Sequence, residues 1–184
     1  MKRILFFLCS AAALSAQDYQ VQLDPARTQV DFTLSATLHT VHGTFAFKQG
    51  SLSFDPVTHS AAGTLTVDAA SGKSGEAGRD SKMHKDILES ARYPEIVFTA
   101  DRFTGDFHPS GDSDVALHGI FRIHGADHEL NLPVHVHASA DTLTADTQFS
   151  VPYIKWGMKN PSTFVLGVGD SVEIAIHASG RISK

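Results

Sequence analysis

Hydrophobic and polar residues alternate along nearly the whole chain, and this period of two limits the fold more than any other feature. In residues 30–38, Val30, Phe32 and Leu34 are separated by Asp31 and Thr33. Successive side chains of a strand point to opposite faces, so this pattern predicts a strand buried on one face. The same alternation recurs in residues 19–23, 45–47, 52–54, 65–69, 96–100, 115–123, 130–136, 143–151 and 172–178.

Turn-forming residues separate these segments. The expected turns lie at residues 24–25, 48–50, 55–56, 109–111 and 125–127. Many short strands joined by turns rather than by crossover helices predict an all-β fold, an antiparallel barrel or sandwich. The chain has 184 residues with neither a linker nor an internal repeat, which favours a single domain.

One short helix interrupts the strands. Met83, Ile87 and Leu88 have helical spacing, which predicts a helix over Ser81–Ser90. Asp80 is placed to cap its first turn, and Pro94 follows its end. The glycine-rich residues 72–78 are expected to form a flexible loop leading into this helix.

The first 16 residues have the pattern of a secretory signal peptide. Lys2 and Arg3 precede an apolar run over Ile4–Leu14, which is too short to span a bilayer. Small residues at positions 15–16 predict cleavage after Ala16, leaving residues 17–184 as the exported domain, periplasmic or secreted. A lipid anchor on Cys9 is an alternative that the bulky preceding residue disfavours.

Cleavage would also change the charge and the redox chemistry. Removing Lys2 and Arg3 from the 15 basic residues leaves 13 against 20 acidic ones, a net charge of −7. That charge disfavours nucleic acid as a partner, because phosphate binding needs a basic surface. Cys9 is the only cysteine, so the mature domain would have neither a disulfide nor a thiol nucleophile.

The sequence contains neither of two common enzyme motifs. Gly72-Lys73-Ser74 lacks the glycine that a phosphate-binding loop needs at position 67, which is Val67. No G-x-S-x-G nucleophile elbow occurs in the chain.

Histidines on the outward strand faces offer an alternative metal site. If Ile123 pairs with Leu130, then His118 lies opposite His135; a register wider by one pair-step would place His118 opposite His137 instead. Three imidazoles so placed would suit Zn(II) or Cu(II). A solvated sheet face on which histidine is merely polar is the favoured interpretation, so no metal is expected.

Phenylalanine occurs 12 times, mostly at inward positions of the predicted strands. A barrel of about eight strands is either filled by its own side chains or holds one small ligand. The periodicity does not choose between these two, and a filled barrel acting as a protein-interaction module stays open.

Several motifs resemble those of the YceI-like family of exported, lipocalin-like proteins. The most specific block is Arg79-Asp80, Met83, Leu88 and Arg92-Tyr93-Pro94-Glu95-Ile96-Val97-Phe98. Supporting segments are residues 41–45, 54–56, 117–125, 155–158 and 169–174. The resemblance extends from Tyr19 to Ile182.

The resemblance implies an antiparallel barrel of about eight strands with one short helix packed near its opening. It also implies a binding protein rather than an enzyme, without a cofactor, that holds a long-chain isoprenoid or another amphiphilic lipid. Transient membrane contact is expected during delivery. Pairing of edge strands across a two-fold axis would give a homodimer if the barrel is incompletely closed.

The expected binding residues are the inward side chains, two helix residues and two aromatic residues with polar tips. Arg79 and Asp80 are interpreted as a local ion pair that holds the loop to the helix, with a place at the mouth as the alternative. The tail channel is assigned to Phe32, Leu34, Phe45, Leu65, Phe98, Phe121, Leu132, Val134 and Phe149. Met83 and Leu88 would line or close it, and Tyr153 and Trp156 would meet the head group.

Overall fold

The computed structural model describes residues 18–37, 39–162 and 167–184. The predicted signal peptide, with Cys9, and Leu38 of the first alternating segment lie outside the described residues. Within the described ranges, no helix has the length and hydropathy needed to cross a membrane.

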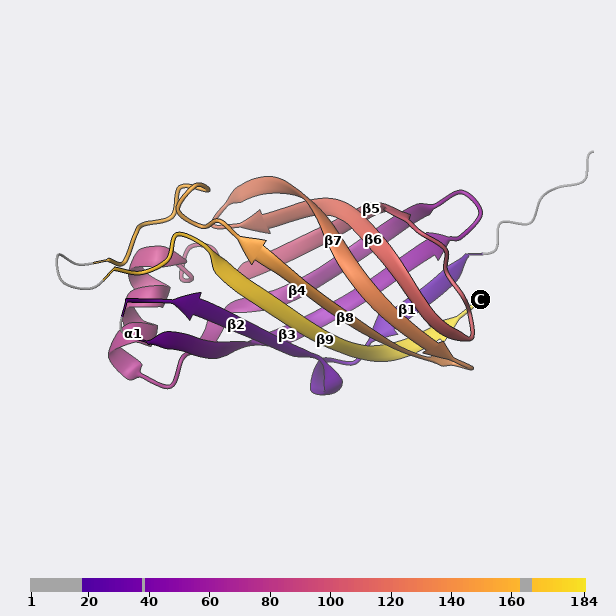
Figure 1. The fold of residues 1–184 in the computed structure, drawn as a ribbon, viewed down its shortest axis with the longest axis horizontal. Helices are drawn as coiled ribbons and strands as arrows, with labels where there is room; N and C mark the ends of the chain where they lie inside the picture. The colour runs from indigo at the N-terminus through magenta and orange to yellow at the C-terminus, as the bar shows by residue number, and fades with distance from the viewer. Residues whose placement is uncertain (1–17, 38, 163–166) are drawn as a thin grey trace, which may run out of the picture.

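The strands run along the long axis of the molecule, and the helix lies across one end (Figure 1). The strands are β1 Tyr19–Leu23, β2 Gln29–Ser35, β3 Thr40–Asp55, β4 Ser60–Lys73, β5 Glu95–Thr104, β6 Gly111–Ile123, β7 Ala126–Ser139, β8 Thr142–Val151 and β9 Val172–Ser183. All paired neighbours are antiparallel.

These strands close into a barrel with eight strand positions. The order is β1-β3-β2-β9-β8-β7-β6-β5-β4, and β3 also pairs with β4 to close the ring. Strands β1 and β2 share one position, because both lie between β3 and β9. The predicted eight-stranded antiparallel barrel is therefore confirmed. Among the described strands, closure leaves no unpaired barrel edge, and such an edge was the condition given for pairing into a homodimer.

A short 3₁₀ turn, η1 (Pro25–Arg27), separates β1 from β2. Pro25 supplies no N–H for a sheet ladder, and the Asp24 carboxylate accepts the N–H of Ala26 at 2.9 Å. The predicted turn at residues 24–25 is thus a break within one barrel strand position.

Strand β3 is continuous where the sequence predicts a turn at residues 48–50. Its pairing with β4 shifts register between Phe47 and Gln49, so a β-bulge replaces the turn. A Cβ at Gly50 would overlap the side chains of Leu65 and Phe47, and the glycine therefore serves close packing inside the barrel.

The hairpin between β6 and β7 is tighter than predicted. Ile123 pairs with Ala126 rather than with Leu130. The two residues between them, His124 and Gly125, have φ angles of 52° and 76°. Positive φ at both central positions defines a type I′ turn, which joins strands through two residues.

The helix begins earlier than predicted. Helix α1 spans Ala77–Lys82 and continues as one π-helical segment, η2, over Met83–Ile87. Glu76 is the cap, because its carboxylate accepts the N–H groups of Gly78 and Arg79 at 2.8 and 2.7 Å. Asp80 instead accepts the N–H and hydroxyl of Ser74. Since β4 extends to Lys73, the predicted loop is also shorter than residues 72–78.

The helix is anchored to the barrel through Gly72. The His84 ring Nε2 lies 2.9 Å from the Gly72 carbonyl oxygen, across from η2 to β4. A Cβ at position 72 would overlap the Phe45 ring and the Met83 methyl group. Glycine here lets the helix approach the barrel wall, so the helix covers that end of the interior.

Candidate binding cavity

Two adjoining cavities lie inside the barrel. The outer cavity has a volume of about 470 Å³ and lies beneath the helix. The inner cavity, of about 160 Å³, lies deeper along the barrel. The two share wall residues, which are Val67, Ile96, Phe121, Phe149 and Ile176. Ligand pockets commonly measure ~300–1,000 Å³, so the outer cavity is large enough for a ligand.

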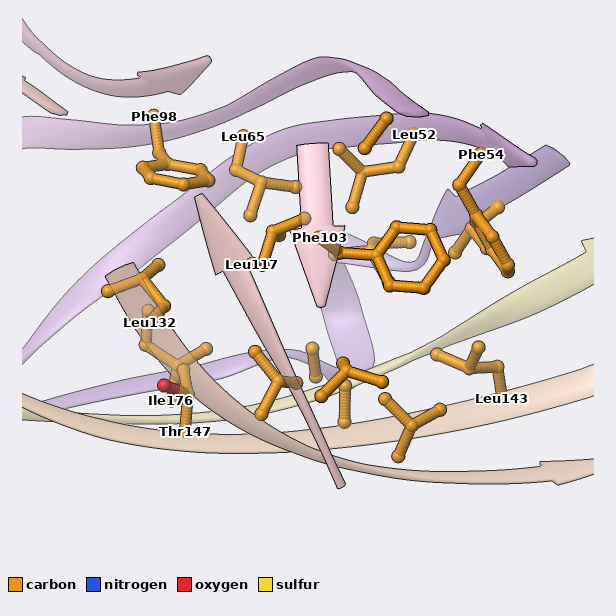
Figure 2. Close-up of a pocket in the computed structure, with 18 of the residues that line it drawn as sticks. Leu52, Phe54, Leu65, Phe98, Phe103, Leu117, Leu132, Leu143, Thr147 and Ile176 are labelled. Atoms are coloured by element: carbon orange, nitrogen blue, oxygen red, sulfur yellow. The ribbon is translucent and has the colours of Figure 1, made fainter. Parts of the chain in front are cut away.

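The inner cavity is almost wholly apolar. Figure 2 shows aliphatic and aromatic side chains from opposite sides of the barrel converging on it, with Phe103 and Leu117 among them. Thr147 is the single described residue with a polar side chain in its wall. The Thr147 hydroxyl is buried and has no hydrogen-bond partner within the described chain. This compartment suits hydrocarbon.

The outer cavity is apolar on its barrel side and polar at the helix end. Its polar wall groups include His39, Ser74, Arg79 and Lys82. No carboxylate lines either cavity in the described part of the chain. The interior therefore has a polar end at the helix and an apolar end deep in the barrel.

Two aromatic residues stand between the compartments. The rings of Phe121 and Phe149 meet edge to face, with centroids 5.9 Å apart and planes at 79°. Both line both cavities. An edge-to-face pair is a favourable arrangement, so these two rings form a defined partition.

Ser74 connects the two charged residues of the predicted ion pair. Its hydroxyl accepts from Arg79 Nε at 2.6 Å and its carbonyl oxygen accepts from Arg79 Nη2 at 2.8 Å. The same hydroxyl donates to Asp80, and the hydrogen bonds from Ser74 lower the pKa of the Asp80 carboxyl, with help from the nearby Arg79 charge. Arg79 and Asp80 are thus joined through Ser74, and Arg79 also lines the outer cavity.

Most residues assigned from the sequence to binding lie in the cavity walls. Those in the outer wall are Phe32, Leu34, Phe45, Met83, Leu88 and Tyr153. Those in the inner wall are Leu65, Phe98, Leu132 and Val134, and Phe121 and Phe149 lie in both.

The two residues expected to meet the head group are placed differently. Trp156 lies in neither wall; its ring stacks on His128, with centroids 3.9 Å apart and planes at 8°. Tyr153 contributes its ring to the outer wall, but its hydroxyl donates to the Gly169 carbonyl at 2.6 Å. Burial raises the pKa of the Tyr153 hydroxyl, with a contribution from Asp170. This hydroxyl holds the β8–β9 loop, so the polar wall groups that face the cavity are His39, Ser74, Arg79 and Lys82 at the helix end.

Phe103 is a wall residue that the sequence pattern missed. Phe98 and Ala100 are inward, so strict alternation would turn Arg102 inward next. A register shift between Ala100 and Arg102 in the pairing of β5 with β6 reverses this parity and turns Phe103 inward instead. The sequence pattern does predict inward positions for Leu117 and Ile176, because both continue the regular alternation.

The three histidines of the alternative metal site do not meet. His118 lies opposite Asn131, four residues before His135 on β7, because the I′ turn sets a different register. His118 is buried, and its ring nitrogens lie 2.6 Å from Asp101 and 3.1 Å from Glu129. Across residues 18–37, 39–162 and 167–184, no group of three or more His, Cys, Asp or Glu side chains is arranged to hold a metal ion.

The outward histidines pair with aspartates on neighbouring strands. The Nδ1 atoms of His135, His137 and His177 each lie 2.6–2.7 Å from an aspartate oxygen, and the partners are Asp114, Asp112 and Asp146, respectively. The hydrogen bond to Asp114 raises the pKa of His135, and the negative charges of Asp114, Asp112 and Asp146 add to this. The rows of histidine and aspartate are hydrogen-bonded side-chain pairs on the outside of the barrel.

Comparison with known proteins gives one family and several similar folds. The family described as YceI-like domain matches residues 21–179. No curated protein matches the chain by sequence. Burkholderia cenocepacia BcnA has a similar structure, with 19% identity, a TM-score of 0.67 and coverage of 88% of this chain and 99% of that one.

Two further solved structures have the same fold. A polyisoprenoid binding domain from Saccharophagus degradans, implicated in plant cell wall breakdown, is 16% identical, with a TM-score of 0.70 and coverage of 89% and 97%. The Campylobacter jejuni YCEI protein is 12% identical, with a TM-score of 0.58 and coverage of 100% and 94%. At these identities the likeness concerns the fold alone.

Proposed function

Because the chain belongs to the YceI-like family, we propose that it is an exported binding protein for a long-chain isoprenoid or a similar amphiphilic lipid. The polarity of the interior carries this proposal. An amphiphile has one polar end and a long apolar remainder, and the cavity has polar groups at the helix and hydrocarbon walls farther in. The Saccharophagus domain of similar fold is described as polyisoprenoid binding, which supports the same ligand class.

The energetics of lipid transfer favour a carrier or reservoir that exchanges its lipid over a protein that binds it very tightly. Burial of one five-carbon isoprene unit from water is worth up to roughly 4 kcal/mol, at about 0.8 kcal/mol per CH₂. A lipid, however, leaves a bilayer rather than water, so most of this term cancels. Net affinity then depends on the shape of the cavity and on the head group, and transient membrane contact suffices for exchange.

Binding rather than catalysis is the proposed activity. The cavity walls contain no carboxylate in the described chain, and the Tyr153 hydroxyl is engaged in a loop contact. The N-terminal pattern supports export, with residues 1–16 as signal peptide and residues 17–184 as the mature periplasmic or secreted domain.

Native mass spectrometry of the mature protein, followed by organic extraction, tests the proposal. A discrete added mass that extracts as a prenyl compound is the expected result. A clean apo mass, with no uptake of prenyl lipid from vesicles, would contradict the proposal and favour a protein-interaction module.

Bulky substitutions in the cavity walls test which cavity the apolar tail of the lipid occupies. Leu34→Trp in the outer wall should weaken binding of all chain lengths, whereas Val134→Trp in the inner wall should weaken binding of long chains selectively. Ile120→Trp is the matched control, because Ile120 is an outward aliphatic residue with 37% exposure. Unchanged affinity in both wall variants, with folding intact, would place the lipid elsewhere.

A further inference from the structure

One residue in the wall of the inner cavity comes from a loop rather than from a strand. Strand β5 begins beside the helix and runs away from it, so the loop of residues 105–110 between β5 and β6 lies at the opposite end of the barrel (Figure 1). Five of its six residues are exposed, and the sixth, Phe107, is half-buried. Phe107 lines the inner cavity, and every other described residue in that wall belongs to a strand.

The Phe107 ring rests on other aromatic rings at this end of the barrel. Its centroid lies 4.8 Å from that of Phe54, with planes at 78°, and 5.2 Å from that of Tyr19, with planes at 65°. Phe54 in turn meets Phe103 edge to face, with centroids 5.6 Å apart (Figure 2). Edge-to-face contacts are favourable for aromatic rings, so these four side chains form a defined cluster that bounds the far end of the cavity.

The backbone on both sides of Phe107 fixes the position of the loop. Gly105 and Gly111 have φ angles of 99° and 108°, which residues with a side chain rarely adopt. The N–H of His108 donates to the Ser113 hydroxyl at 2.8 Å. These constraints hold the residues next to Phe107 and leave its ring against the cavity.

We propose, on the basis of the lipid-binding function above, that Phe107 determines the longest tail that the barrel binds, because its ring stops the end of the tail. A tail that passes the rings of Phe121 and Phe149 lies against apolar walls until it meets this ring. A longer chain must leave its surplus carbons outside the apolar interior or displace the ring. One methylene more or less in an apolar pocket changes discrimination by about 10–200-fold, so a surplus isoprene unit should be rejected clearly.

Farnesol, geranylgeraniol, hexaprenol and solanesol are the probes, because they share a hydroxyl head group and differ in tail length. Each prenol is supplied in phosphatidylcholine vesicles, and its uptake by the mature protein is measured by native mass spectrometry. Each variant is compared with the wild type for the same prenol, so the partitioning of that prenol into the bilayer cancels.

We expect the affinity of the wild type to fall beyond a limiting chain length. Phe107→Ala should raise the affinity for the first excluded chain about tenfold and leave shorter chains unchanged. Phe107→Trp should lower the affinity for the longest accepted chain by a similar factor. Val57→Ala is the matched control, because Val57 is an apolar residue of the β3–β4 turn at the same end, 70% exposed and absent from both cavity walls.

Each other outcome has a separate meaning. An unchanged limit in both Phe107 variants, with folding intact by circular dichroism, would overturn the assignment and leave lipid binding intact. An equal loss for all chain lengths in Phe107→Ala would show a packing residue and overturn it as well. A wild type without any length limit, or the same shift in Val57→Ala, would also overturn it. Uptake of no prenol by the wild type would refute the proposed function and this inference with it.

Discussion

Replacing Thr147 by valine should stabilise the protein without ligand. The hydroxyl of Thr147 is buried in the hydrocarbon wall of the inner cavity and has no partner within the described chain. An unsatisfied buried polar group costs about 1–3 kcal/mol. Valine has nearly the same shape and the same β-branch, so strand propensity is conserved and the polar group is removed. We expect a gain of about 1–2 kcal/mol in the free energy of unfolding.

Thermal and urea unfolding of the delipidated mature domain measure this gain. For a domain of this size, it corresponds to an increase in melting temperature of about 2–8 °C. Thr64→Val is the matched control, because Thr64 is an exposed residue of β4, and its effect should stay within about 0.5 kcal/mol.

A neutral or destabilising Thr147→Val, beside an unaffected control, would refute the reasoning about an orphaned hydroxyl. Prenyl-lipid affinity should be retained or rise in this variant, since the tail gains an apolar contact. A marked loss of affinity would mean that the hydroxyl contacts a polar atom of the ligand.

Two further changes test other parts of the molecule. Phe149→Ala removes one ring of the partition, so we expect a shift in preference toward longer prenyl chains and a destabilisation of about 3 kcal/mol, measured by a chain-length series and by urea unfolding; an unchanged length preference would show that the ring does not separate the compartments. Asp114→Asn removes the main cause of the raised His135 pKa. That raised pKa adds stability below the unfolded value of about 6.5 and loses it as pH rises through the folded value. The variant should therefore lower the melting temperature more at about pH 5.5 than at about pH 8.5, and an equal decrease at both would contradict the linkage.

The fold could be predicted from the sequence because the alternation of apolar and polar residues shows which face of each strand is buried. Val30, Phe32 and Leu34 follow it without interruption, and all three line the outer cavity. Eight such strand positions can cover their apolar faces by closing on one another, and ring closure also pairs every edge. The helix was detected from the spacing of Met83 and Ile87, while its start depends on the cap at Glu76 rather than on apolar residues.

Register and bulges were not predictable, since they depend on contacts between strands. Gly50 occurs within a sequence that is typical of a turn, but it lies in β3 beside a bulge, where Leu65 and Phe47 leave no space for a Cβ. The bulge in β5 likewise brings Phe103 into the cavity. A two-residue turn at His124–Gly125 moved His118 away from His135. A register shift of one residue turns every later side chain of the strand to the opposite face of the sheet. These bulges and turns therefore decide which residues share a site.

Whether a barrel is filled or hollow depends on volumes, which no alternation pattern contains. An inner cavity of about 160 Å³ forgoes roughly 4 kcal/mol of packing, at about 24 cal/mol per Å³ of cavity volume. The closed ring of strand pairs holds the shape of the barrel despite this loss, because each strand position is hydrogen-bonded on both sides. A bound hydrocarbon tail would restore the missing contacts and stabilise the folded state by mass action. The phenylalanine-rich interior thus has two effects. Burial of its side chains favours closure of the barrel, and the space that they leave favours an apolar ligand.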